Sequence, residues 1–156
     1  MIKLLRVDKR LLHGQVAFTW TSSLGADCIL IACDTLQNDP LRLTTIKLSK
    51  PSGAKLVIKN VEESIAAINE GKTDKYVLFI VVECIKDAYR LLKGCPDIGG
   101  VSLGYTDARE GCEKLANSIF TTEEEIVLLR ELIQEGKDVT IQTVPTAKAT
   151  SVKRLL

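Results

Sequence analysis

Residues 2–16 read IKLLRVDKRLLHGQV, and this stretch decides the fold because a short apolar strand leads directly into a polar loop and a helix. Ile2–Val7 is predicted to be a strand, and Gln15–Leu24 a helix in which Val16 and Trp20 recur at helical spacing. The rest of the chain repeats this alternation. Continuous apolar strands that alternate with helices are typical of a parallel sheet covered on both faces. We therefore expect an α/β fold with an open, mostly parallel sheet of about six or seven strands and helices on both faces.

The remaining elements follow from apolar runs and helix-start signals. Asp39 before Pro40 predicts a helix start, and residues 122–125 read TEEE, a capping box. Further strands are expected at 28–33, 55–59, 76–82, 98–103, 114–119 and 139–144, and further helices at 40–49, 61–70, 85–93 and 122–135. The tail 146–156 is left unassigned. No repeat or linker divides the chain, so residues 1–156 are expected to form one domain.

Composition excludes several classes of function. The 21 basic and 20 acidic residues give a net charge of +1, which provides no general attraction to nucleic acid. An odd number of cysteines without a C-x-x-C pair indicates reduced thiols in a cytoplasmic protein, and a lone histidine offers no metal site. The start of the chain is expected to be a strand and not a signal peptide, and the longest apolar run, residues 76–82, is far short of the ~20 residues that cross a bilayer.

The only histidine, His13, lies where the first strand gives way to the first helix. Free backbone N–H groups and the positive end of a helix dipole meet at such a junction, and phosphate binds there. The backbone at Gly14 and Gln15 is therefore a candidate phosphate site. A partly uncharged imidazole at this point can act as a nucleophile toward phosphorus.

Charged residues surround the histidine in the sequence. Arg10 is a candidate clamp, because a guanidinium can hold two phosphate oxygens at once. Arg6 and Asp8 share one face of the first strand, so they either pair with each other or Asp8 orients His13. Asp34, at the end of the second strand, is expected to line the same crevice. The residues alone leave a purely structural interpretation open, in which His13 has no role in chemistry and these charges form ordinary ion pairs.

The motif Arg6-Val7-Asp8-x-Arg10-Leu11-x-His13-Gly14-Gln15-Val16, with Trp20 shortly after it, resembles the phosphorylation site of a known family. This family comprises the IIB components of the mannose/fructose/sorbose class of the bacterial sugar phosphotransferase system. Similar segments recur at 38–42, 51–56, 104–111 and 139–145, so the resemblance covers essentially the whole chain.

The resemblance implies a phosphoryl carrier with an open α/β sheet. Such a carrier accepts a phosphoryl group from a phosphohistidine on the IIA component and holds it on Nδ1 of its own histidine, here His13. It then passes the group to a sugar bound by the membrane components IIC and IID, which hold the carrier at the inner face of the membrane. Arg10 would help to hold the phosphate, and no metal, nucleotide or other cofactor is required.

The chain departs from the family pattern at two places near the expected site. Glu83 and Cys84 stand where the family often has a hydroxyl residue, and Tyr105 replaces a common second glycine after Gly104. The sequence identifies neither the sugar nor the oligomeric state, monomer or dimer.

Two other classes of protein remain as alternatives. One is a non-catalytic anion-binding or regulatory α/β domain, in which His13 only donates a hydrogen bond. The other is a receiver domain phosphorylated on Asp8 or Asp34, although no lysine and acidic pair lie at the strand ends where a receiver needs them.

Overall fold

The computed structural model describes residues 1–156 and has a central seven-stranded sheet in the order β3-β2-β4-β1-β5-β8-β9. Its strands are β1 (Ile2–Asp8), β2 (Cys28–Ala32), β3 (Lys55–Lys59), β4 (Leu78–Val82), β5 (Gly100–Tyr105), β8 (Asp138–Ile141) and β9 (Thr150–Ser151). Every neighbouring pair is parallel except β8 and β9, which are antiparallel. The predicted fold class is confirmed.

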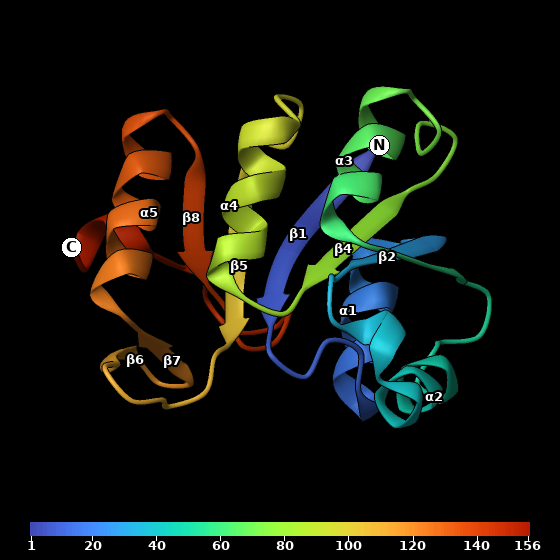
Figure 1. Ribbon diagram of the computed structural model, residues 1–156, viewed down its shortest axis with the longest axis horizontal. Coiled ribbons are helices and arrows are strands. Elements are labelled where there is room, and N and C mark those ends of the chain that lie inside the picture. The colour runs from blue at the N-terminus through green and yellow to red at the C-terminus, as the bar shows by residue number, and fades with distance from the viewer.

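Helices cover the two faces of the sheet in separate groups (Figure 1). The helices are α1 (Gly14–Leu24), α2 (Pro40–Leu48), α3 (Val61–Asn69), α4 (Ile85–Gly94) and α5 (Glu123–Gln134), with short 3-10 turns at Leu36–Asn38 and Val152–Arg154. Side chains from α3, α4 and α5 share one buried cluster, and side chains from α1 and α2 share the other. Strand residues alternate between the clusters, so that Leu30 belongs to the first and Ile29 and Ile31 to the second.

The strand order places the loop after β1 at the middle of the sheet edge. From β1 the sheet extends through β4 and β2 on one side and through β5 and β8 on the other. Ligands of open α/β sheets bind outside the carboxyl ends of the strands, where the strand order reverses in this way. The loop that carries His13 therefore occupies the position at which such sheets bind ligands.

One expectation about the last third of the chain needs correction, and the structure assigns the tail that the sequence left open. The strand expected at 114–119 is a separate antiparallel hairpin of β6 (Glu113–Ala116) and β7 (Ile119–Thr121), outside the main sheet. Ser118, whose φ of 66° is left-handed, makes the turn that interrupts the run. The unassigned tail adds β9 to the sheet edge and buries Val152 completely. No helix combines the length and the apolar character that a membrane span requires.

Candidate functional site

The loop between β1 and α1, residues 9–13, is fixed by its own backbone and by two buried side chains. The Asp8 carbonyl accepts a hydrogen bond from the Leu11 N–H at 2.8 Å, and Asp8 Oδ1 accepts one from the Arg10 N–H at 2.9 Å. Leu11 adopts a left-handed φ of 59°, a strained conformation for leucine. Leu11 and Leu12 are both buried in the α1 and α2 cluster, and this packing holds the strained turn in place.

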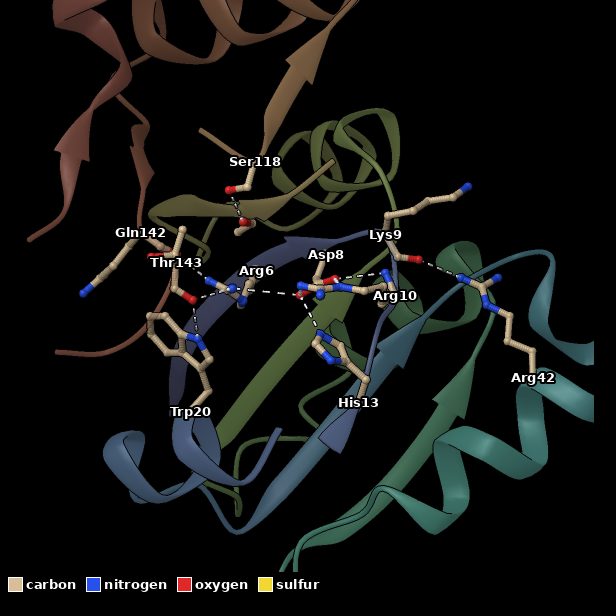
Figure 2. Close-up of polar contacts among 11 residues, drawn as sticks. Arg6, Asp8, Lys9, Arg10, His13, Trp20, Arg42, Ser118, Gln142 and Thr143 are labelled. Atoms are coloured by element: carbon tan, nitrogen blue, oxygen red, sulfur yellow. Dashed lines mark hydrogen bonds and ion pairs between the residues drawn. The ribbon is translucent and has the colours of Figure 1, made fainter. Parts of the chain in front are cut away.

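The Asp8 carboxylate lies at the centre of the site (Figure 2). It is only 2% exposed and faces three groups that carry, or can carry, positive charge. Its oxygens lie 3.2 Å from Arg10 Nε, 3.2 Å from His13 Nε2 and 3.9 Å from Arg6 Nη2. Both roles proposed for Asp8 therefore hold together, because it pairs with Arg6 and also contacts the imidazole.

The His13 ring is turned so that its two nitrogens differ in chemistry. A carboxylate only accepts hydrogen bonds, so the 3.2 Å contact with Asp8 favours the neutral tautomer that has its proton on Nε2 and a lone pair on Nδ1. His13 is the N-cap residue of α1, but its side chain makes no capping hydrogen bond. The first-turn N–H groups of Gly14 and Gln15 are thus available to an anion. The side chain is 25% exposed, so the ring is accessible from solvent.

Gly14 has a backbone requirement of its own. Its φ of 43° lies in the left-handed region, which L-residues with side chains rarely adopt. Nothing lies within 4 Å of the position that a Cβ would occupy, so dihedral strain and not crowding selects glycine at the start of α1.

Arg6 is a buried structural anchor and not a ligand of the exposed face. Its guanidinium donates hydrogen bonds to the carbonyls of Gln142 (2.6 Å) and Thr143 (3.0 Å) and lies 4.6 Å from the centre of the Trp20 ring. Burial lowers the pKa of Arg6 to about 10 against the opposing effect of Asp8, so the group stays charged near neutral pH. Arg6 thereby links β1 to the segment after β8 and also pairs with the Asp8 carboxylate.

Arg10, the candidate clamp, pairs with Asp8 through two donors and has a further partner that the sequence did not predict. Its side chain is 48% exposed, and Nε and Nη2 donate to the two Asp8 oxygens at 3.2 and 3.4 Å. The guanidinium also lies over the ring of Tyr105, with 4.1 Å between Arg10 Cζ and the ring centre. The replacement of a glycine by Tyr105 was the one sequence signal for this contact.

A second arginine near the loop also escaped the sequence analysis. Arg42, on α2, donates to the Lys9 carbonyl at 3.1 Å and pairs with Glu83 at 2.9 Å, and Glu83 accepts from the Thr35 hydroxyl at 3.0 Å. Burial opposes ionisation of Glu83, but the hydrogen bonds from Arg42 and Thr35 outweigh it and lower the pKa. The extra carboxylate is therefore neutralised by Arg42. Burial raises the pKa of Cys84 to about 12, which keeps that side chain a neutral thiol.

Asp34 was expected to line the crevice beside His13, but its carboxylate binds other neighbours. Its carboxylate accepts a hydrogen bond from the Val61 N–H at 2.9 Å and another from Arg90 at 2.7 Å. The bond from Val61 is the larger cause of its lowered pKa, and the bond from Arg90 adds to it. Asp34 thus fastens the start of α3 to the end of β2 and makes no contact with His13. The expectation failed because adjacent strand ends can send their side chains to different neighbours.

Comparison with known proteins identifies the family. The model of the phosphotransferase system (PTS) sorbose subfamily IIB component matches residues 2–156. The chain belongs to this family. This IIB component is 32% identical to a probable phosphotransferase enzyme IIB component of Streptococcus pyogenes, over 100% of this chain and 99% of the relative. It is 28% identical to the sorbose-specific EIIB component of Lacticaseibacillus casei, over 97% of this chain and 93% of the relative.

Solved structures agree with the fold. The IIBSor domain of the sorbose permease from Klebsiella pneumoniae superposes with a TM-score of 0.93 at 24% identity, covering 99% of this chain and 95% of that one. The N-acetylgalactosamine-specific IIB component 1 of Escherichia coli gives a TM-score of 0.88 at 26% identity, covering 96% of this chain and 98% of that one. Family membership gives this IIB component a phosphotransfer role in a sugar phosphotransferase system.

Proposed function

We propose that this IIB component carries a phosphoryl group on Nδ1 of His13. It accepts the group from a phosphohistidine on a IIA component and transfers it to a sugar bound by the membrane components IIC and IID. The protein works in the cytoplasm and associates with the inner face of the membrane through IIC and IID. In this proposal residues 1–156 form one IIB domain that needs no metal or other cofactor.

The observation that carries the proposal is the contact between His13 Nε2 and Asp8 Oδ2 at 3.2 Å. It supports a ring orientation in which Nε2–H faces the carboxylate and Nδ1 carries the lone pair that attacks phosphorus. A phosphoryl group on this ring would lie beside the first turn of α1, and the Arg10 guanidinium is the exposed cation bonded to the same carboxylate.

In the transfer, each bond that forms is matched by a bond that breaks, so no other reactant is needed. The Nδ1 lone pair attacks phosphorus in line, a new N–P bond forms, and the N–P bond of the donor breaks. The donor imidazole keeps the electron pair of the broken bond and takes a proton from solvent. Arg10 and the N–H groups of Gly14 and Gln15 stabilise charge on the transferring oxygens. The positive charge on the phosphorylated ring is stabilised by Asp8 through Nε2–H.

The test is phosphorylation by phosphoenolpyruvate, the general phosphotransferase proteins and IIA, followed by mass mapping of the modified peptide. We expect label on His13 in the wild type and none in the His13→Ala protein. Arg10→Ala should slow transfer about tenfold to a hundredfold, the value of a hydrogen bond to a charged group. The matched control is Arg130→Ala, because Arg130 is an exposed arginine on α5 without an ion pair. Label retained by the His13→Ala protein would contradict the proposal.

The stability of the label separates the alternatives. A phosphohistidine is lost in acid and survives alkali, whereas an acyl phosphate on Asp8 or Asp34 is lost in alkali. The absence of any covalent label, with phosphate binding intact, would favour the non-catalytic anion-binding domain.

A further inference from the structure

The side chain of Tyr105 at the end of β5 has no role in the transfer described so far, yet it makes the closest aromatic contact in the site. The Arg10 guanidinium carbon lies 4.1 Å from the centre of the Tyr105 ring, within the range of a cation–π interaction. Arg10 is also about half exposed, so this ring and Asp8 are the contacts that restrict its long side chain.

Hydrogen bonds hold the backbone of Tyr105 and of the residues before and after it. The Tyr105 carbonyl accepts a hydrogen bond from the Lys9 N–H at 3.0 Å, and Tyr105 pairs with Asp8 in the register of β1 and β5. The neighbouring residues are held by the β6–β7 hairpin: Ser118 Oγ donates to the Gly104 carbonyl at 3.1 Å, and the Ser118 carbonyl accepts from the next N–H after Tyr105 at 2.9 Å. The backbone that carries the ring is therefore held in place on the sheet.

Stacking restricts Arg10 without using any of its hydrogen-bond donors. Nε and Nη2 of Arg10 point to Asp8, and Nη1 donates no hydrogen bond within the protein. The guanidinium carbon lies over the ring, and the N–H donors of a planar guanidinium lie along its edge. A phosphoryl oxygen can thus be bound at the edge while Arg10 stays on Tyr105.

We propose that Tyr105 is a positioning residue that preorganises Arg10 for the phosphoryl group. This inference rests on the proposed function, because it deepens the role given to Arg10. In the absence of the ring, the half-exposed side chain of Arg10 samples more rotamers, and each contact with the transferring group costs more conformational entropy.

The test compares Tyr105→Leu with Tyr105→Phe, which keeps the ring and loses only the hydroxyl. The donor is phosphoramidate, a small molecule whose N–P bond breaks as ammonia leaves, so that changes in protein docking do not enter the rate. Label on His13 is followed by mass spectrometry. We expect Tyr105→Leu to slow labelling about two- to fivefold, as the loss of one exposed cation–π contact predicts, and Tyr105→Phe to match the wild type.

A double-mutant cycle separates positioning from a merely structural effect. In the Arg10→Ala background, Tyr105→Leu should cause no further slowing, because the residue that the ring orients is gone. Equal slowing in both backgrounds, or a wild-type rate for Tyr105→Leu, would overturn the inference and leave the proposed function intact.

A second readout does not depend on phosphorylation. Exchange of the Arg10 Nε–H with water, measured by NMR in the unlabelled protein, should be faster in Tyr105→Leu and unchanged in Tyr105→Phe. If the wild type takes no label on His13, the proposed function fails, and this exchange still decides whether Tyr105 holds Arg10. Exchange unaffected by Tyr105→Leu would overturn the positioning role.

Discussion

Gly104→Ala is predicted to be severely destabilising, although Gly104 has no unusual backbone angle. A Cβ built on Gly104 would lie 2.1 Å from Cζ, 2.2 Å from Nη2 and 2.6 Å from Nη1 of Arg6. The end of a flexible side chain can often move away from such a contact. Arg6 cannot do so cheaply, because it is held by Asp8, by the two carbonyls after β8 and by the face of Trp20.

The magnitude follows from the contacts that Arg6 would lose. Two hydrogen bonds from a charged donor are worth about 1.5–3 kcal/mol each, and displacement of a buried ionic partner costs about 3–5 kcal/mol. The displaced guanidinium recovers part of this energy by hydration, so we expect a loss of about 3 kcal/mol in the free energy of unfolding. For a chain of this size, that loss lowers the melting temperature by roughly 6–12 °C.

Urea unfolding monitored by circular dichroism measures this loss. The matched control is Gly99→Ala, because nothing lies within 4 Å of a Cβ on Gly99 and its φ is not left-handed. In an Arg6→Met background, Gly104→Ala should cost far less than in the wild type, since the guanidinium is gone. A Gly104→Ala protein as stable as Gly99→Ala would refute the claim that Arg6 is fixed in place.

Three further predictions concern Asp8, Glu83 and Thr122. Asp8→Asn should slow phosphorylation of His13 roughly a hundredfold, because an amide can donate to Nε2 and shift the ring proton to Nδ1; single-turnover labelling measures the rate and ¹⁵N NMR the tautomer. The pKa of Glu83 is lower in the folded protein than its ordinary value of 4.5. The stabilisation from its pairing with Arg42 is therefore fully present above pH 4.5 and is lost as the pH falls through the lower pKa of the folded state. Urea titrations across that range should show a smaller loss for Glu83→Gln, and an equal loss would contradict the pairing. Thr122→Ala removes the capping side chain of α5 and should cost about 1 kcal/mol in chemical unfolding, with no change in phosphorylation.

The misplacement of Asp34 has its physical cause in the range of the contacts involved. The capping box at Thr122 and the helix start at Asp39 were predictable because both depend on contacts within four residues, and the structure confirms them. Asp34 was misplaced because its partners, Val61 and Arg90, lie 27 and 56 residues away in sequence. A carboxylate at a strand end can pair with any neighbouring donor, and the sequence does not show which neighbour the fold brings to it.

The sequence by itself determined the alternation of strands and helices, the parallel sheet and the location of His13 at a strand-to-helix junction. These features depend on local periodicity and on helix-end chemistry, which a single stretch of chain carries. Only the tertiary structure decided that Asp8 contacts Arg6, Arg10 and His13 together, that the Arg6 guanidinium lies where a Cβ on Gly104 would be, and that the Arg10 guanidinium lies over the Tyr105 ring. The contacts of Asp8 stay within residues 6–13, whereas those of Arg6 and Arg10 join β1 and its loop to β5 and to the segment after β8, and this geometry exists only once the sheet register brings strands distant in sequence side by side.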